Sequence, residues 1–306
     1  MSDTSSPPSL CGYIAVIGAP NAGKSTFVNQ VVGNKVSIVS SKVQTTRSRI
    51  LGIALRGHAQ IILMDTPGLF NPQSRLDRAM VSAAWSGTQE ADAVLYLFDS
   101  KKKGLSHDDE KTLTRLKELS ESKPVYLALN KVDIAERERL FKLATDLNNF
   151  CPFVSTFMIS ALSGDGVEDV VAALVKNLPS SPWLFGEDQI SDMPMRLLAA
   201  EVTREQIFVQ LYQELPYAVT VETEKWEQFD NGDIRIQQVI HIERENQKSI
   251  ILGKNGERLR EIGTKARLEL EKMLDRKVHL KLFVRVSERW RDDPDYYQQW
   301  GLDYKA

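Results

Sequence analysis

The chain has 306 residues, 42% of them hydrophobic and 26% charged, and its formal net charge at pH 7 is −2. This composition predicts a soluble globular protein of about two domains, and no apolar run approaches the ~20 residues that span a bilayer. The two cysteines, Cys11 and Cys151, match no metal or redox spacing and are typical of a reduced intracellular compartment. The chain begins with a polar stretch that lacks the apolar core of a signal peptide, so we expect residues 1–10 to be a disordered N-terminus.

The first predicted domain, residues 11–180, alternates short apolar runs with longer amphipathic segments. The runs predicted as strands are Tyr13–Ile17, Gln60–Met64, Ala93–Phe98, Val125–Leu129 and Val154–Ile159. The segments predicted as helices lie near Lys24–Val32, Asp108–Leu119, Glu136–Asn149 and Val167–Leu178. Buried runs interleaved with helices predict an α/β domain with a mostly parallel sheet covered on both faces, and Arg49–Leu55 adds one antiparallel strand through a hairpin at Gly57.

A break rich in proline, serine and glycine follows Leu178, and we place a linker at residues 181–195. Residues 196–306 predict a smaller α+β domain with the element order α-β-β-α-α-β. The apolar face of its first helix is predicted to hold Leu198, Val202, Val209 and Tyr212, and Pro216 ends that helix. Asn231-Gly232 marks a hairpin between the first two strands, and Gly253-Lys254-Asn255-Gly256 joins the last two helices.

A glycine-rich loop after the first strand is the clearest binding motif. Gly18-x4-Gly23-Lys24-Ser25 matches the P-loop pattern in full and lies between a predicted strand and a predicted helix, as that motif requires. Backbone N–H groups and the positive helix end suit phosphate oxygens, Lys24 supplies a charge to the β/γ-phosphates, and Ser25 supplies a hydroxyl to Mg²⁺. The predicted phosphate-binding residues are Gly18, Ala19, Pro20, Asn21, Ala22, Gly23, Lys24, Ser25 and Thr26.

The identity of the nucleotide base is predicted by Asn130-Lys131-Val132-Asp133, at the end of the Val125–Leu129 strand. The Asp133 carboxylate can accept hydrogen bonds from the N1–H and 2-amino groups of guanine, and adenine offers no such pair of donors. Asn130 can bridge to the P-loop, and Lys131 can cover the ring. After the last strand, Ser160-Ala161-Leu162 suits a backbone contact to the guanine O6.

Two further segments suit Mg²⁺ and the γ-phosphate. Asp65-Thr66-Pro67-Gly68 ends a strand, where Asp65 suits a position behind Mg²⁺ and the Gly68 N–H suits the γ-phosphate. In the polar segment Gly33–Arg47, Thr46 is the favoured threonine for both ligands, with Thr45 as the alternative. The expected catalytic residues are Lys24, Thr46 and Gly68. Leu69 follows, where a glutamine could orient the attacking water, so water must be positioned from elsewhere or intrinsic hydrolysis is slow.

Together these motifs resemble the Era family of GTPases, with GAPNAGKS, QTTR, DTPGL, NKVD and SAL in that order. The resemblance runs from about Gly12 to Tyr304 and implies that residues 196–306 are a type II KH domain. It implies a GTPase that uses GTP, GDP and Mg²⁺, binds the 3′ end of 16S rRNA and assists maturation of the 30S subunit. In the family an apolar residue stands where Leu69 does, and some relatives hold K⁺ through a P-loop asparagine, here Asn21. The implied setting is a cytoplasmic monomer, and some members associate peripherally with the inner membrane.

Charge and a glycine turn favour RNA independently of that resemblance. A Gly-x-x-Gly turn lets a nucleic-acid backbone approach closely. Residues 244–291 hold fourteen Lys and Arg against seven Asp and Glu, whereas residues 196–243 hold four against nine. The expected RNA-binding residues are Ile251, Gly253, Lys254, Asn255, Gly256, Arg258 and Lys281. Lys281 shares a strand face with Lys277, His279, Phe283 and Arg285, which is either an RNA or ribosome contact or an ordinary solvated face.

Other function classes make different demands. A P-loop kinase or ATPase of metabolism needs a phosphoacceptor site and has no need of the Asn130–Asp133 motif. A scaffold with a vestigial nucleotide site would not need Lys24, Ser25, Asp65 and Asp133 all intact. A P-loop GTPase acting on a different RNA stays open at this point. A comparison of guanine with adenine nucleotide binding would distinguish a metabolic kinase or ATPase from a GTPase. The identity of the bound RNA would distinguish a GTPase with a different RNA target.

Overall fold

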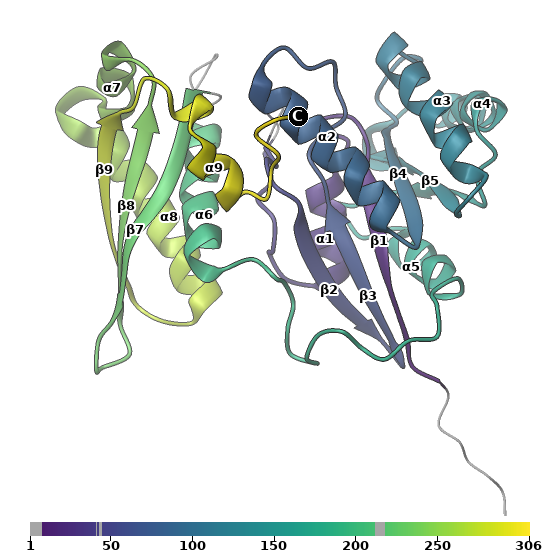
Figure 1. Cartoon of the computed structure of the whole chain (residues 1–306), viewed down its shortest axis with the longest axis horizontal. Helices are drawn as coiled ribbons and strands as arrows, with labels where there is room; N and C mark the ends of the chain where they lie inside the picture. The colour runs from purple at the N-terminus through teal and green to yellow at the C-terminus, as the bar shows by residue number, and fades with distance from the viewer. Residues whose placement is uncertain (1–7, 41, 43–44, 212–217) are drawn as a thin grey trace, which may run out of the picture. The chain divides into compact units, whose positions relative to one another are not determined.

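The computed structural model describes residues 8–40, 42, 45–211 and 218–306, which form two compact units (Figure 1). The first unit comprises Met1–Ser37, Thr46–Asp192 and Trp300–Ala306, and the second comprises Ile38–Thr45 and Met193–Gln299. The chain is therefore not divided once at the predicted linker. Most of residues 181–195 pack with the first unit: the backbone N–H of Ile53, for example, donates to the Ile190 carbonyl at 2.9 Å. Leu10 already belongs to a strand, and the expectation of disorder for residues 1–7 lies outside the described residues.

The first unit is built on a six-stranded sheet with the order β2-β3-β1-β4-β5-β6. Its strands are β1 (Leu10–Ile17), β2 (Ile50–Arg56), β3 (Ala59–Asp65), β4 (Ala93–Asp99), β5 (Val125–Asn130) and β6 (Thr156–Ile159). Only β2 runs antiparallel to its neighbour among these strands, so the predicted mostly parallel sheet with one antiparallel strand is confirmed. Parallel strands bring their carboxyl ends to one edge of the sheet, where ligands of such folds bind.

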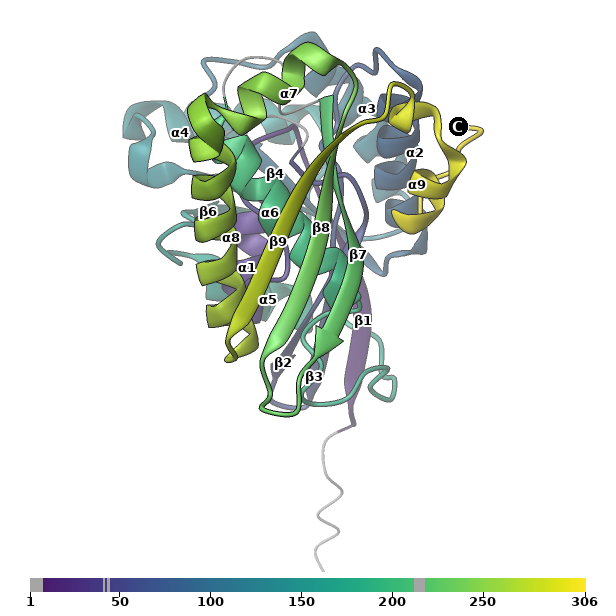
Figure 2. The ribbon, with the colours of Figure 1, turned by 90° about the vertical axis from the view of Figure 1, so that its left-hand side faces the viewer.

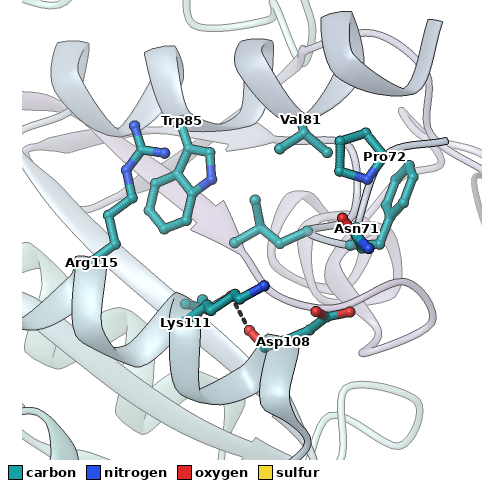
Figure 3. A pocket seen from close by; sticks show the side chains of 10 residues that line it. Asn71, Pro72, Val81, Trp85, Asp108, Lys111 and Arg115 are labelled. Atoms are coloured by element: carbon teal, nitrogen blue, oxygen red, sulfur yellow. Dashed lines mark hydrogen bonds between the residues drawn. The ribbon is translucent and has the colours of Figure 1, made fainter. Parts of the chain in front are cut away.

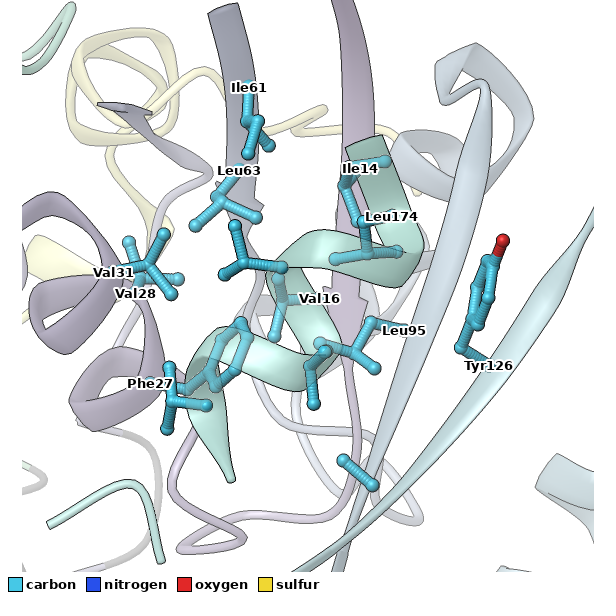
Figure 4. Packing of buried hydrophobic residues seen from close by; sticks show 14 of the residues in the cluster. Ile14, Val16, Phe27, Val28, Val31, Ile61, Leu63, Leu95, Tyr126 and Leu174 are labelled. Atoms are coloured by element: carbon cyan, nitrogen blue, oxygen red, sulfur yellow. The ribbon is translucent and has the colours of Figure 1, made fainter. Parts of the chain in front are cut away.

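Helices cover both faces of this sheet, as predicted. They are α1 (Lys24–Val32), α2 (Arg75–Glu90), α3 (His107–Ser120), α4 (Arg137–Phe150) and α5 (Val167–Val175). Along β1, Ile14 and Val16 pack in one hydrophobic cluster with α1 and α5, shown in Figure 4, and Ala15 and Ile17 pack in the other with α2, α3 and α4. Alternate residues of one strand thus bury both faces, which is why the strand is apolar throughout.

The helix α2 is absent from the sequence-based prediction, although two signals for it exist. Ser74 caps the helix: its side chain accepts from the Asp77 N–H, and Asp77 accepts in return from the Ser74 N–H. Six of the buried positions along the helix follow a helical spacing: Leu76, Ala79, Met80, Ala84, Trp85 and Thr88. The stripe is as marked as in the other helices, so the sequence itself carried the signal for α2.

The second unit is an α+β layer in the predicted order α-β-β-α-α-β. Its elements are α6 (Met195–Gln210), β7 (Val219–Gln228), β8 (Ile234–Ile242), α7 (Glu245–Leu252), α8 (Glu257–Leu274), β9 (Val278–Val286) and, after these, α9 (Pro294–Gln299). The strand order is β7-β8-β9, with β8 antiparallel to β7 and parallel to β9 (Figure 2). A three-stranded sheet with one helical face matches the predicted architecture.

The apolar face of this sheet is built from alternate residues of β8 and β9. Ile234, Ile236, Ile240 and Ile242 are buried, as is Val278 at the start of β9. One detail of the helix prediction is wrong, because Val209 is 56% exposed and lies off the buried face of α6. The predicted positions of Tyr212 and Pro216 lie outside the described residues. Within the described ranges, no helix has both the length and the apolar character needed to cross a membrane.

Candidate functional site

The predicted phosphate loop connects β1 to α1 and needs glycine at two of its positions. Gly18 has φ 154° and Gly23 has φ 98°, a region that side chains strongly disfavour. A Cβ atom on Gly18 would lie 2.3 Å from the Leu97 carbonyl oxygen, and one on Gly23 would lie 2.2 Å from the side-chain nitrogen of Asn130. Both glycines therefore allow neighbouring strands to close around the loop, at the carboxyl edge of the sheet.

Lys24, the first residue of α1, is buried beneath this loop. Its ammonium group donates to the backbone carbonyls of Gly18 at 3.2 Å and Ala19 at 3.0 Å. Burial lowers the pKa of Lys24 to about 8, with the nearby Asp65 carboxylate acting in the opposite direction. A cation held in a dry loop and short of counter-charge suits an anionic ligand, because that ligand would restore the electrostatic stabilisation that burial removes.

Three oxygen-bearing side chains meet beside Lys24. The Ser25 hydroxyl donates to the Asp65 carboxylate at 2.7 Å and lies 2.9 Å from the Thr46 hydroxyl oxygen. Asp65 is fully buried, which raises its pKa, and among the described residues its Oδ1 atom has no hydrogen-bond partner. Hydroxyl and carboxylate oxygens are the ligands that Mg²⁺ prefers, so these residues fit the predicted metal. Thr46 and not Thr45 lies in this cluster, since the Thr45 hydroxyl donates to the Lys42 carbonyl.

The segment after β3 contacts the phosphate loop directly. A Cβ atom on Gly68 would lie 2.8 Å from the backbone nitrogen of Pro20, so the residue must be glycine for the two segments to stay this close. The Leu69 N–H donates to the Gly18 carbonyl at 2.9 Å. Thr66 has a structural role, because its hydroxyl donates to the Val16 carbonyl at 2.8 Å.

The Leu69 side chain is buried in the apolar core and is not available to bind water. It is 6% exposed and belongs to the same buried cluster as Trp85 of α2. Leu69 and Trp85 also line a pocket of about 210 Å³ between α2 and α3, in which the Arg115 guanidinium lies 4.1 Å from the Trp85 ring centroid (Figure 3). An apolar residue packed in this way cannot orient an attacking water.

The predicted base-binding segments are linked to the phosphate loop by Asn130. Its side-chain nitrogen donates to the Ala22 carbonyl at 2.7 Å, and its side-chain oxygen accepts from the Ala161 N–H at 2.9 Å. Asp133 is exposed in the short 3₁₀ turn η1 (Val132–Ile134). Ser160 and Ala161 are buried, and Leu162 is 80% exposed. The structure therefore brings the segments ending β1, β5 and β6 together at one edge.

Lys131 has a partner that the sequence-based prediction missed. Its ammonium group forms a 2.6 Å ion pair with Asp99, the last residue of β4. The Lys131 backbone has φ 67°, so the strand turns sharply here. Asp99 carries no motif of its own. The only available signal is that it ends a strand adjacent to β5, because strand ends at this edge lie near one another.

Comparison with known proteins identifies the two halves. Residues 13–131 match the family described as 50S ribosome-binding GTPase, and residues 214–291 match the KH domain family. The GTPase Era of Rhizobium meliloti is 56% identical over 97% of this chain and 94% of its own length. The GTPase Era of Brucella suis is 51% identical over 99% of this chain and 96% of its own length. This chain belongs to the Era family of GTPases.

Two solved Era structures share the fold of the whole chain. Era in complex with MgGDPNP and nucleotides 1506–1542 of 16S ribosomal RNA matches with a TM-score of 0.89 and 38% identity, over 96% of this chain and 99% of that one. A variant of Aquifex aeolicus Era bound to GDP and aluminium fluoride matches with the same TM-score and identity, over 95% of this chain and 99% of that one. The sequence-based resemblance to Era is thus confirmed.

The KH half of this chain presents the Gly-x-x-Gly turn to solvent. Gly253 and Gly256 adopt φ 68° and 76°, and Lys254 and Asn255 between them are exposed. A Cβ atom on Gly253 would lie 2.8 Å from the Arg258 Cβ, so this glycine lets the chain reverse between α7 and α8. The turn combines an open backbone with a basic side chain, as contact with a phosphate backbone requires.

The other predicted RNA-binding residues differ in accessibility. Arg258 and Lys281 are exposed, and Lys281 lies on the side of β9 that alternates with the buried face. Ile251 is fully buried in the apolar core of the second unit, so its prediction as an RNA contact is wrong. Its position beside the turn suggested contact, but the helical register of α7 directs it into the core.

A contact within the second unit was also missed. Arg204 of α6 is fully buried and its Nε donates to the Glu201 carboxylate at 2.6 Å, while another guanidinium nitrogen donates to the Thr45 carbonyl. Glu205 accepts from the Val39 N–H at 2.8 Å. Val39 and Thr45, which precede Thr46, thus contact α6. These contacts had one signal in the sequence. Glu201, Arg204 and Glu205 lie at buried positions of α6, and charged residues are seldom buried without a partner.

Proposed function

We propose that this member of the Era family is a GTP-hydrolysing switch that binds the 3′ end of 16S rRNA and assists assembly of the 30S subunit in the cytoplasm. One observation carries the proposal: the chain matches, over nearly its full length, an Era protein crystallised with a GTP analogue and that rRNA segment. The buried Lys24, the Ser25–Thr46–Asp65 cluster and the exposed Gly-x-x-Gly turn support it. The expectations of a monomer and of peripheral membrane contact stay predictions.

Each residue of the site has a separate role in the proposed reaction. The loop from Gly18 to Thr26 would cradle the phosphates, and Lys24 would neutralise their charge as the γ-phosphate leaves. Ser25 and Thr46 would hold Mg²⁺ with Asp65 behind them, and the metal would supply further neutralisation of the developing charge. The Gly68 N–H would contact the γ-phosphate. Because Leu69 packs in the core, this chain offers no side chain at that position to orient water, and we expect slow intrinsic hydrolysis.

Crosslinking in cells, followed by sequencing of the attached RNA, tests the proposed RNA. We expect the reads to concentrate at the 3′ end of 16S rRNA. A parallel culture that expresses a variant with aspartates at Lys254 and Asn255 provides the control, and its reads there should be depleted. Enrichment of another RNA by the wild-type protein would support the alternative of a GTPase with a different target.

Potassium dependence tests the role of Asn21, which lies half-buried in the phosphate loop with φ 62°. If its side chain holds K⁺ beside the phosphates, replacing K⁺ by Na⁺ at equal ionic strength should lower the GTPase rate. The Asn21→Ala variant should show the same rate in both salts. A wild-type rate that does not depend on the cation would leave Asn21 as a loop-shaping residue.

The lowered pKa of Lys24 predicts a pH dependence of nucleotide binding. Without ligand this lysine loses its proton near pH 8, and bound phosphates should raise its pKa because they favour the charged form. Binding must then take up a proton above that pH, so affinity for GDP should fall as pH rises, by up to about tenfold per pH unit. Titration calorimetry in two buffers of different ionisation enthalpy measures the uptake directly. Uptake of most of a proton is expected at about pH 8.5 and little at about pH 7, whereas equal uptake at both would contradict the assignment.

A further inference from the structure

The end of the chain returns to the GTPase unit. The C-terminal tail, residues Trp300–Ala306, follows the second unit in sequence but packs within the first unit. Trp300 is 6% exposed and Leu302 is 7% exposed, so both side chains serve as apolar anchors. Figure 1 shows the tail beside α2. A short terminal segment stays ordered only when such contacts hold it, and these contacts define where it is held.

Two arginines of the GTPase unit stack on the aromatic rings of the tail. The Arg47 guanidinium lies 5.6 Å from the Trp300 ring centroid, and that of Arg75 lies 4.7 Å from the Tyr304 ring centroid. Arg75 also donates a hydrogen bond to the Tyr304 hydroxyl. Arg47 is buried, at 4% exposure, so its contact with the ring is shielded from water. Cation–π attraction is strongest at such desolvated sites.

These arginines follow, in the chain, the two segments assigned to the γ-phosphate under the proposed function. Arg47 directly follows Thr46, whose hydroxyl lies 2.9 Å from that of Ser25. Arg75 opens α2, which follows the Gly68 segment that contacts the phosphate loop. The tail therefore holds the neighbours of both segments that would distinguish GTP from GDP.

We propose that the C-terminal tail is a positioning element for the γ-phosphate site, which favours the GTP-bound arrangement by holding Arg47 and Arg75. The proposal rests on the nucleotide site assigned under the proposed function. Because binding linkage is reciprocal, a ligand that orders Thr46 and Gly68 must also strengthen docking of the tail. GDP lacks the γ-phosphate and so gains little from the tail.

Affinities of the full chain for GDP and for a non-hydrolysable GTP analogue, both with Mg²⁺, test the proposal. In Trp300→Ala and in Tyr304→Ala, affinity for the analogue should fall about threefold to tenfold while affinity for GDP changes less than about twofold. Trp300→Phe is the matched control, because it keeps a ring beneath Arg47, and it should retain most of the preference. Tyr304→Phe keeps the ring but loses the hydroxyl bonded to Arg75, so its loss should lie between those of the wild type and Tyr304→Ala. Equal losses for both nucleotides would mean that the tail only stabilises the fold, and would overturn the proposal.

Hydrogen exchange of the unmodified protein gives a second readout that needs no variant. Amides of residues 300–306 should exchange more slowly with the GTP analogue bound than with GDP bound. Identical exchange in the two states would overturn the proposal even if a variant failed to fold. Loss of guanine-nucleotide binding by the wild-type protein would instead contradict the proposed function, so the two failures are distinguishable.

Discussion

Replacing Asp133 with asparagine should convert a guanine site into one that accepts xanthine. The carboxylate is expected to accept two charge-assisted hydrogen bonds from guanine, each worth about 1.5–3 kcal/mol. Loss of the carboxylate should therefore weaken GTP binding by at least about a hundredfold. The new amide can donate to the extra carbonyl of xanthine, so xanthosine triphosphate should gain affinity. Competition of unlabelled nucleotides against a fluorescent one measures both changes.

The matched control for this variant is Glu138→Gln. Glu138 is exposed in the first turn of α4, so the substitution removes one nearby negative charge without touching the predicted base contact. Asp133 is exposed as well. The free energy of unfolding of both variants, measured by thermal melts, should therefore stay within about 0.5 kcal/mol of the wild-type value. An unchanged preference for guanine in Asp133→Asn would remove the assignment of the base-binding segment.

Replacing Lys254 and Asn255 with aspartates should weaken RNA binding and leave GTP binding unchanged. The two side chains are exposed in the Gly-x-x-Gly turn, where a phosphate backbone would meet two new negative charges. Asn255 has φ 52°, which aspartate tolerates, so folding should survive. Affinity for a single-stranded RNA with the 16S 3′ sequence should fall at least about tenfold, and the salt slope should flatten by about one unit.

Lys272→Glu provides the control for this RNA experiment. It reverses a charge on the exposed last turn of α8, at the opposite end of that helix from the turn. RNA affinity should change far less in this variant, which separates a local contact from a general effect of net charge. If the double aspartate variant kept wild-type affinity and salt slope, the turn would be only a connector. RNA recognition would then have to involve the exposed face of β9 around Lys281.

Much of this protein follows from local sequence patterns. Period-two alternation and continuous apolar runs report which strands are buried, so the mostly parallel sheet and the α-β-β-α-α-β layer were predictable. The phosphate loop was predictable because its chemistry lies in contiguous residues whose backbone N–H groups and Lys24 act together. The order of five such motifs is enough to indicate the Era family. These features share one physical property: the residues that matter are close in sequence.

What the sequence alone did not determine depends on contacts between distant residues. The burial of Leu69 against Trp85, the pairing of Lys131 with Asp99 and the burial of Ile251 each depend on how helices and strands pack. Arg75 and Tyr304, which hydrogen-bond, are 229 residues apart, and Arg204 and Thr45 are 159 apart. Such partners leave no periodic trace in the chain, because a side chain's neighbours across a fold are set by the packing of whole elements. Only the tertiary structure could therefore reveal that Val39 and Thr45 contact α6 and that the C-terminal tail belongs to the GTPase unit.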